Sequence, residues 1–372
     1  MELTTRRIHN FNAGPAALPL EVLQQAASEL EDFNDTGMSI MEHSHRGESY
    51  EEVHNEAIAL VKRLLDIQAD YEVLLLQGGA SLQFAMVPYN LLAPSQKANY
   101  MMTGSWSEKA KKEADILGQT YSGASTKDEN YAYIPVFDQI ETDPEDAYIH
   151  VTSNNTIYGT AWQREDFERM SEWSAPVVVD MSSDIFSRTL PIENFDLIYA
   201  GAQKNLGPSG VTLVIISKAM LEKSTSITQN VPSILRYNTH ADKNSLYHTP
   251  PTFAVYMLKN TLQWIENAGG LTAMEAENRK KAQLLYNVID ESNGFYQGHA
   301  HPDSRSDMNV TFTLPSEALT DRFLQEAKDL HFIGLNGHRS VGGCRASIYN
   351  AVSYESCKAL RDFMISFQIN NQ

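Results

Sequence analysis

The stretch "YAGAQKNLGPSG", residues 199–210, places one lysine, Lys204, directly after an apolar run and surrounds it with small residues. Similar runs occur from Tyr71 to Ser217: "YEVLLLQ", "ANYMMTG", "AYIHVTS", "APVVVDMS", "DLIYAGA" and "VTLVIIS". Each run is continuous rather than alternating in polarity, which is typical of strands that are covered on both faces. The sequence therefore predicts an α/β fold in which helices sandwich a mixed, mostly parallel sheet.

The C-terminal part of the chain has a different pattern. A helical pattern starts near Phe253, is interrupted by a pair of glycines and resumes until about residue 290. The runs "MNVTFTL", "SEALTDRFLQEAKDL", "CRASIYNAV" and "YESCKALRDFMISF" then predict a β-α-β-α unit. We expect an N-terminal arm at residues 1–15, followed by a helix near 20–33, a large domain at 16–265 and a smaller α+β domain at 266–372.

Composition excludes several classes of partner. The formal net charge of −18 argues against nucleic acid and against an anionic membrane surface, because both require clustered Lys and Arg. No apolar stretch is long enough for a signal peptide or a membrane span, so we expect a cytoplasmic protein. Cys344 and Cys357 have neither disulfide-framework nor metal-site spacing and are interpreted as apolar fillers, and we expect no metal.

Lys204 stands where an open α/β sheet binds its ligands, at the carboxyl end of a strand. A nucleotide P-loop is excluded because GxxxxGK[ST] does not occur and the glycines follow the lysine. A buried amine at this position can form a Schiff base with an aldehyde, and pyridoxal phosphate is the common aldehyde cofactor. The position of Lys204 therefore raises the hypothesis of a pyridoxal phosphate enzyme.

This hypothesis makes three demands on the rest of the chain. A carboxylate must keep the ring nitrogen protonated, and Asp180 ends the apolar run "APVVVD". The phosphate needs backbone N–H groups at a helix N-terminus, which Gly79, Ala80 and Ser81 offer in "LLLQGGASLQF". A flat aromatic must cover the ring, and Trp106 lies in the next strand-to-helix turn. The demands are met in the expected order along the chain.

The sequence as a whole resembles the phosphoserine aminotransferase family, which has the fold-type-I architecture with a seven-stranded-type sheet. The matching stretches are "FNAGPAALP", "HSHRGESYEEVH", "LLQGGASLQF", "TGSWSEKA", "SNNTIYGT", "VVDMSSD", "GAQKNLGPSG", "YHTPPTF" and "NGHRSVGGCRASIYNA". The resemblance implies amino transfer from L-glutamate to 3-phosphohydroxypyruvate, giving O-phospho-L-serine and 2-oxoglutarate in serine biosynthesis. A second phosphorylated keto acid, from vitamin B6 synthesis, stays open as a substrate.

The resemblance also implies a role for each matching residue. Lys204 would carry the Schiff base, Asp180 would pair with the ring nitrogen, and Trp106 would stack on the ring. Further cofactor contacts would come from Ala80, Ser81, Thr156 and Gln203, and from Asn238 and Thr239 of "RYNTH", which in the family reach the cofactor phosphate of the other subunit. This pattern implies a homodimer with shared active sites.

Five further residues are implied in substrate binding: Arg345 for the α-carboxylate, and His45, Arg46, His338 and Arg339 for the distal phosphate or carboxylate. The repeated His-Arg pair suits a doubly anionic substrate, because arginine offers two parallel donors. At the phosphate loop some relatives carry Gly-Arg where this chain has Ala80-Ser81, so one potential cation is missing.

Other functions stay open at this point. The chain could be another small-acid aminotransferase of the same fold or a cysteine desulfurase, although Gln203 stands where the latter usually has a histidine. It could also be a phosphate-ligand-binding α/β module without catalysis.

Overall fold

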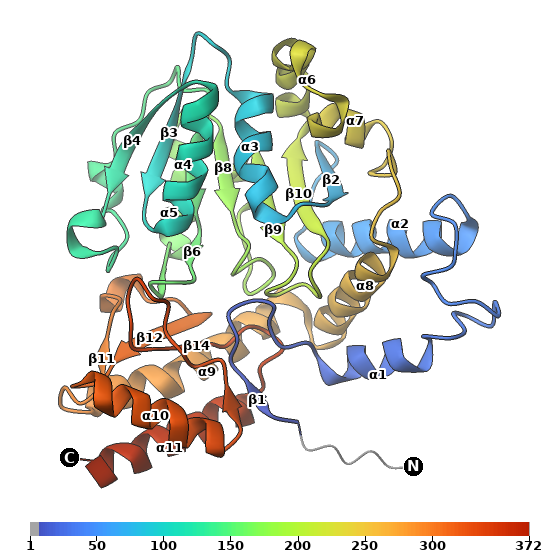
Figure 1. Cartoon of the computed structure of the whole chain (residues 1–372). Coiled ribbons are helices and arrows are strands. Elements are labelled where there is room, and N and C mark those ends of the chain that lie inside the picture. The colour runs from blue at the N-terminus through green and yellow to red at the C-terminus, as the bar shows by residue number, and fades with distance from the viewer. Residues whose placement is uncertain (1–6, 372) are drawn as a thin grey trace.

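The computed structural model describes residues 7–371 and contains a central seven-stranded sheet in the order β2-β10-β9-β8-β5-β3-β4 (Figure 1). Its strands are β2 (Tyr71–Leu76), β3 (Lys97–Met102), β4 (Gln119–Ser125), β5 (Ile149–Thr152), β8 (Val177–Asp180), β9 (Leu197–Gly201) and β10 (Thr212–Ser217). Strand β10 runs opposite to the other six strands of this sheet and is therefore antiparallel to both of its neighbours, β2 and β9. The predicted α/β fold with a mixed, mostly parallel sheet is confirmed.

Alternate residues of the strands pack into two different apolar layers. Val73 and Leu75 join a cluster with the helices α1 (Leu20–Ser28), α2 (Glu48–Leu64) and α8 (Thr252–Asn267). Leu74 and Leu76 face the opposite side. That side is covered by the helices α3 (Gly79–Leu91), α4 (Ser105–Leu117), α6 (Lys218–Ile227) and α7 (Tyr237–Ala241). Burial on both faces explains why the strand sequences are continuously apolar.

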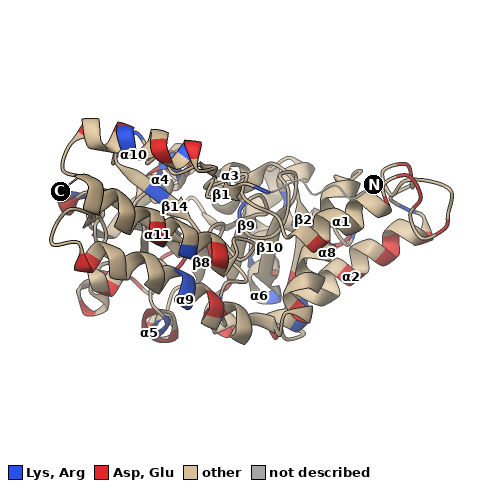
Figure 2. Cartoon of the chain, turned by 90° about the horizontal axis from the view of Figure 1, so that it is seen from below, with Lys and Arg blue, Asp and Glu red and all other residues tan. Residues whose placement is uncertain are grey.

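The C-terminal part has its own apolar cluster and a three-stranded antiparallel sheet of order β11-β12-β14. Its elements are α9 (Gly270–Glu291), β11 (Gln297–Gly298), β12 (Asn309–Thr313), α10 (Glu317–Asp329), β13 (Phe332–Ile333), β14 (Cys344–Ser347) and α11 (Tyr354–Asn371). Figure 2 shows charges of both signs along α9 and α10. The predicted β-α-β-α pattern is present, whereas the domain boundary near residue 265 stays a prediction.

The remaining elements are short. They are β1 (His9–Asn10), β6 (Asn154–Asn155), β7 (Thr160–Ala161), α5 (Arg164–Arg169) and the 3₁₀ turns Lys127–Glu129, Phe137–Gln139, Met170–Glu172, Ile192–Asn194, Thr228–Asn230, Ser233–Leu235 and Pro302–Ser304. Among the described helices, none is long and apolar enough to cross a membrane.

The N-terminal arm crosses from the small part to the large one. Residues 1–6 of the predicted arm lie outside the described residues. Strand β1 pairs in parallel with β13, and Phe11 is fully buried in the C-terminal cluster. Further along, Ala16 N–H donates a 2.9 Å hydrogen bond to the carbonyl of Gln203. The arm therefore contacts both the small part and the loop that carries Lys204.

Candidate active site

Lys204 lies in the loop that follows β9, as the sequence predicts. Its Nζ donates a 2.9 Å hydrogen bond to Thr156 Oγ1 and lies 5.4 Å from the centre of the Trp106 ring. The pKa of Lys204 is lowered to about 8, mainly by burial and in part by the positive charge of Arg345. The negative charge of Asp180 acts in the opposite direction. At pH 7 roughly a tenth of this amine is then uncharged, far more than for an ordinary lysine, and the uncharged form is the nucleophile.

The N-terminal arm packs against the side chain of Lys204. Gly14 has a φ of +145°, and a Cβ there would approach Lys204 Cγ to 3.2 Å. Glycine thus lets the arm pass directly beside the lysine stem.

Asp180 ends β8 and is only 6 % exposed. Its Oδ1 accepts hydrogen bonds from the backbone N–H of Ser182 at 3.0 Å and from the Ser182 hydroxyl at 2.6 Å. Burial raises the pKa of Asp180, while the two bonds from Ser182, the charge of Lys204 and a hydrogen bond from Tyr199 oppose that rise. The structure thus places an anchored carboxyl group near the amine of Lys204.

The N-terminus of α3 follows β2 through a glycine turn. Gly78 and Gly79 have φ values of +91° and +65°, and a Cβ on Gly78 would lie 2.5 Å from Leu82 Cδ2. Ala80 is half-buried and Ser81 is exposed in the first turn of the helix. Free backbone N–H groups at such a helix start suit an anion.

Trp106 is half-buried in the first turn of α4. Its ring lies beneath two amines, with Lys109 Nζ at 4.3 Å and Lys204 Nζ at 5.4 Å from the ring centre. Its Nε1 is buried without a hydrogen-bond partner among the described residues. The ring is therefore at the same edge of the sheet as Lys204.

Arg345 extends from β14 of the small part toward the same edge. Its Nη1 donates a 3.4 Å hydrogen bond to the backbone carbonyl of Thr156. Its Nε is buried and, within residues 7–371, has no partner, and burial lowers its pKa. An arginine with an unused donor in this position is suited to a carboxylate ligand.

His338 and Arg339 lie in a tight turn before β14. The turn is closed by the 2.9 Å bond from Gly337 N–H to the Gly343 carbonyl. His338 Nδ1 lies 2.7 Å from Ser340 Oγ. Burial lowers the pKa of His338, and the charges of Arg345, Arg339 and Lys109 lower it further. Several cations thus gather around this turn.

Four of the predicted residues lie elsewhere in the same chain. His45 and Arg46 belong to the connection between α1 and α2, which Figure 1 shows at the outer end of that helix pair. Asn238 and Thr239 belong to α7, beside α6 and away from the carboxyl ends of the strands (Figure 1). The Asn238 amide donates to the Leu221 carbonyl at 3.0 Å and to Ser224 Oγ at 2.8 Å.

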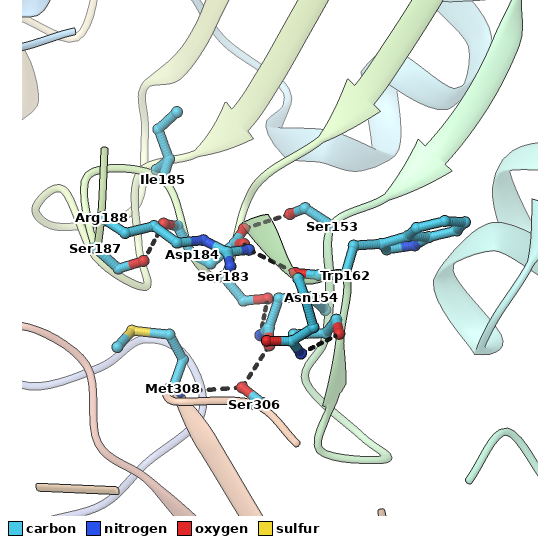
Figure 3. Close-up of polar contacts among 12 residues, drawn as sticks. Ser153, Asn154, Trp162, Ser183, Asp184, Ile185, Ser187, Arg188, Ser306 and Met308 are labelled. Atoms are coloured by element: carbon cyan, nitrogen blue, oxygen red, sulfur yellow. Dashed lines mark hydrogen bonds and ion pairs between the residues drawn. The ribbon is translucent and has the colours of Figure 1, made fainter. Parts of the chain in front are cut away.

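A buried polar network behind the site was missed by the sequence reasoning (Figure 3). Asn154 Nδ2 donates to Ser183 Oγ at 2.7 Å and to Asn309 Oδ1 at 2.8 Å, and its Oδ1 accepts from Ser306 Oγ. Asn309 Nδ2 in turn donates to Ser347 Oγ at 2.9 Å. Asn154 therefore joins the turn after β8 to β12 and β14, which carry the small part's contribution to the site. The only sequence signal was a polar pair directly after an apolar strand.

Asp184 and Ser153 continue this network toward Asp180. Ser153 Oγ donates to the Asp180 carbonyl at 3.0 Å and to the Asp184 carboxylate, which forms an ion pair with Arg188 at 3.1 Å (Figure 3). Arg188 also donates a 2.9 Å bond to the Trp162 carbonyl. The turn that follows Asp180 is thereby tied to its neighbours by charged and uncharged hydrogen bonds.

The two cysteines lie outside this site. Cys344 and Cys357 are free and buried, and burial raises the pKa of each thiol to about 12. Thiols with such pKa values are unreactive at neutral pH, which argues against the desulfurase alternative. Within residues 7–371, no group of three His, Cys, Asp or Glu side chains is placed to hold a metal ion.

The chain is similar to known proteins over almost its whole length. The family model described as aminotransferase class-V matches residues 8–360. The phosphoserine aminotransferase of Lysinibacillus sphaericus is 59 % identical over 368 residues, which cover 99 % of this chain and 100 % of that protein.

Two solved structures have the same fold over almost the whole chain. That of phosphoserine aminotransferase from Bacillus circulans subsp. alkalophilus has a TM-score of 0.95 and 52 % identity, covering 99 % of this chain and 100 % of that one. That of PLP-bound phosphoserine aminotransferase from Trichomonas vaginalis has a TM-score of 0.90 and 36 % identity, covering 96 % of this chain and 100 % of that one. The chain belongs to the phosphoserine aminotransferases, within the class-V aminotransferases.

Proposed function

We propose that this chain transfers the amino group of L-glutamate to 3-phosphohydroxypyruvate, with O-phospho-L-serine and 2-oxoglutarate as products. The observation that carries this proposal is the convergence of Lys204, Asp180 and Arg345 at one edge of the sheet. Burial lowers the pKa of Lys204 to about 8, and its amine lies within hydrogen-bonding distance of Thr156. A nucleophilic amine, a buried carboxylate and a carboxylate-binding arginine are the groups that amino transfer requires.

The residues present fit pyridoxal phosphate, the cofactor of this family. The glycine turn before α3 leaves an anion-binding helix start for its phosphate, to which Ala80, Ser81 and Gln203 would contribute. Asp180 would hold the ring nitrogen, Trp106 would cover the ring, and Thr156 would bind its phenolic oxygen. When bound, pyridoxal phosphate supplies an aldehyde that reacts with amines and a ring that withdraws electrons from the substrate's α-carbon.

The side chains of this protein then perform three tasks. Arg345 binds the α-carboxylate, which fixes the orientation of the α-carbon relative to Lys204. Lys204 Nζ, as a free amine, would accept the proton from the substrate's α-carbon and deliver it to the C4′ carbon of the bound cofactor, which is general base catalysis followed by general acid catalysis. Asp180 remains ionised and thereby keeps a proton on the ring nitrogen.

The two His-Arg pairs would bind the distal phosphate of the substrate. His338 and Arg339 stand near Arg345, as the effect of both arginines on the pKa of His338 indicates. His45 and Arg46 belong to the connection between α1 and α2, and Asn238 and Thr239 belong to helix α7, away from the carboxyl ends of the strands of their own chain (Figure 1). Their separation supports a homodimer in which a second copy supplies residues to each active site. The two free cysteines support a location in the cytoplasm.

Steady-state kinetics of the two half-reactions test the substrate assignment. A phosphate monoester carries nearly two charges at neutral pH, because its second pKa is about 6, whereas the distal carboxylate of glutamate carries one. Arg46→Ala should therefore lower kcat/KM for phosphoserine at least about tenfold more than for glutamate. Arg345→Ala should lower both alike, because it binds the α-carboxylate that the substrates share. Equal losses in Arg46→Ala would point to a general small-acid aminotransferase.

A further inference from the structure

Lys281 of α9 is a fully buried lysine that none of the cofactor or substrate assignments uses. Its Nζ donates hydrogen bonds of 3.0, 2.9 and 2.9 Å to the backbone carbonyls of Ile348, Tyr349 and Val352. An ammonium group has three N–H donors and no acceptor, so the three carbonyls use its full capacity. Burial lowers the pKa of Lys281 to about 8, which leaves most of the amine charged at pH 7. Lys281 therefore binds the segment 348–352 by three charge-assisted hydrogen bonds.

The three carbonyls compensate the burial of this charge. Within residues 7–371 no carboxylate forms an ion pair with Lys281, and Glu277, one turn earlier on α9, is paired with Lys280 at 4.0 Å. A buried charge without hydrogen bonds is costly, so the ammonium and the carbonyls stabilise one another. The segment 348–352 directly follows β14, which carries Arg345. Its position is thus tied to α9.

One of the three carbonyls belongs to the peptide group that contacts the loop of Lys204. The carbonyl of Tyr349 and the N–H of Asn350 form one planar trans peptide, in which they point in opposite directions. The carbonyl accepts from Lys281, and the N–H donates a 2.9 Å hydrogen bond to Asn205 Oδ1. A positive charge at the carbonyl polarises the amide and strengthens the hydrogen bond that its N–H donates. Lys281 and Asn205, the residue after Lys204, are therefore joined through a single rigid group.

Both polar atoms of the Asn205 side chain are hydrogen-bonded, and the residue is only 5 % exposed. Its Nδ2 donates a 2.6 Å hydrogen bond to the carbonyl of Ile185, in the turn that follows β8. The amide faces a carbonyl with its nitrogen and an N–H with its oxygen, so its two partners determine its orientation. Asn205 thus binds the Lys204 loop to the segment 348–352 on one side and to the turn after Asp180 on the other.

The same segment also supports the N-terminal arm. The hydroxyl of Tyr349 is fully buried and donates a 2.8 Å hydrogen bond to the carbonyl of Ala13. The next residue of the arm, Gly14, packs against the side chain of Lys204. Tyr349 therefore contacts Lys281 through its carbonyl and the arm through its hydroxyl. Two of the contacts that surround Lys204 depend on the placement of one segment.

We propose that Lys281 is a positioning residue for Lys204. Its ammonium fixes the segment 348–352, and this segment fixes the Lys204 loop through the hydrogen bond to Asn205. This inference rests on the proposed function only in giving Lys204 its role in proton transfer. The hydrogen bonds themselves exist in the cofactor-free protein and are testable there.

The first measurement is amide hydrogen exchange of the cofactor-free protein, followed by mass spectrometry. Lys281→Met removes the three donors and keeps a side chain of similar length. Peptides that cover the loop 202–206 should then exchange about fivefold faster, the change expected when one buried hydrogen bond is lost. The N–H of Leu206, bonded to the Ala202 carbonyl at 3.0 Å, reports on this loop.

Tyr296→Phe is the matched control. It removes another buried donor to a backbone carbonyl of the C-terminal cluster, since the Tyr296 hydroxyl donates to the carbonyl of Met364 at 2.8 Å. Exchange of the loop 202–206 should stay at the wild-type rate in this variant. Equal exchange of the loop in Lys281→Met and Tyr296→Phe would refute the proposal.

The charge of Lys281 can be measured in the wild-type protein, without a variant that has to fold. A buried ammonium whose three N–H groups are all hydrogen-bonded exchanges its protons slowly, so its ¹H–¹⁵N NMR signal should be visible at pH 7. A ¹⁵N shift typical of a neutral amine would overturn the proposal, because such an amine has only two N–H donors for three carbonyls.

A double-mutant cycle on the cofactor-loaded enzyme tests the path through Asn205. Lys281→Met and Asn205→Ala should each lower kcat at least about tenfold, because small displacements of a catalytic group are costly. Both changes break the same connection, so the double variant should lose little more than the worse of the two single variants. Losses that multiply in full would show that Lys281 acts independently of Asn205 and would refute the proposal.

An isotope effect separates displacement of Lys204 from a loss of folded enzyme. With α-deuterated glutamate the isotope effect on kcat should rise in Lys281→Met, because a displaced Lys204 slows proton transfer from the α-carbon. A variant that merely lowers the amount of folded enzyme keeps the wild-type isotope effect, and that result in Lys281→Met would contradict the proposal.

Hydrogen exchange without cofactor distinguishes this inference from the proposed function. Faster exchange of the loop 202–206 with unchanged kcat and isotope effect would support the connection but refute the role of Lys204 in proton transfer. Unchanged exchange of the loop would refute the connection whatever the activity of the enzyme.

Discussion

The amine of Lys204 and the hydroxyl of Thr156 are joined by a 2.9 Å hydrogen bond, although the two residues stand in different loops. The same Thr156 accepts a 3.4 Å bond from Arg345 through its backbone carbonyl. One residue thus contacts both Lys204, the proposed reactive amine, and Arg345, the proposed carboxylate-binding arginine. The charge of Arg345 consequently reaches Lys204 and contributes to lowering its pKa.

We predict that capture of pyridoxal phosphate by the cofactor-free protein follows the titration of Lys204. The rate, measured by stopped-flow absorbance, should rise through about pH 8 rather than near 10.5, the ordinary value for lysine. Arg345→Met removes a nearby positive charge, so the pKa of Lys204 should rise and the midpoint should move to higher pH. Arg322→Met, on the exposed face of α10, is the control and should leave the midpoint in place. A midpoint near 10.5 in the wild type would contradict the prediction.

The lowered pKa of Lys204 also makes the stability of the protein depend on pH. Between about pH 8 and 10.5 the unfolded chain binds more protons at this lysine than the folded chain does. The free energy of unfolding of the cofactor-free protein should therefore gain a contribution from Lys204 as the pH rises through this window. Lys204→Met should lack that contribution, which urea unfolding at several pH values would reveal.

Asp180→Asn should abolish most turnover while the protein keeps its fold. The amide has almost the same shape but cannot hold a proton on the ring nitrogen, and loss of one such preorganised group typically costs about 100-fold or more in kcat. Because burial raises the pKa of Asp180, the carboxylate opposes folding at neutral pH, and the melting temperature of the cofactor-free variant should not fall. Turnover within about threefold of the parent would assign the role of Asp180 to another group.

Asn154→Leu should destabilise the protein by about 2–4 kcal/mol. The leucine has a similar volume, but Ser183, Ser306 and Asn309 each lose a buried hydrogen-bond partner. Urea unfolding would measure the loss, with Asn287→Ala on the exposed side of α9 as a control expected to change stability by less than about 0.5 kcal/mol. A similar effect in the two variants would show that the network contributes little.

A shared active site predicts complementation between two inactive chains. One chain carries Lys204→Ala, and in the other Asn238 and Thr239 are both replaced by Phe. After dissociation and mixing in equal amounts, about a quarter of the active sites should contain neither defect, because half of the dimers are mixed and each has one intact site. Activity assays should recover a comparable share of the parental rate. Absence of recovery despite confirmed subunit exchange would place Asn238 and Thr239 in the site of their own chain.

The continuous apolar strands of the large sheet could be predicted because burial on both faces leaves a direct mark on composition. Strand β4 was missed, since it lies at one edge of the sheet and its residues, Gln119–Ser125, are mostly polar and partly exposed. The antiparallel direction of β10 could not be predicted either, because an apolar run in the sequence does not indicate which way the strand runs in the sheet. Lys204 and Asp180 were found because each directly follows or ends such a run.

The buried polar residues around the site, such as His150 and Asn154, could not be recognised from a comparable sequence pattern. His150 lies within an apolar run, and its contact with Tyr199 depends on the order of strands in the sheet. Asn154 meets Asn309 only because the small part folds back onto the large one. Pairings between residues that are far apart in sequence require the tertiary structure, even where the reactive groups themselves are recognisable.

The pairing of β1 with β13 determines when during synthesis the site can be completed. His9 is synthesised well before its partner Phe332, which stands far along the chain. At typical translation speeds the interval is roughly a quarter of a minute to a minute. Until then the segment around Gly14, which packs against Lys204, lacks the strand that anchors it. A nascent chain in which β13 has not yet been made therefore exposes its lysine without the wall that the arm provides.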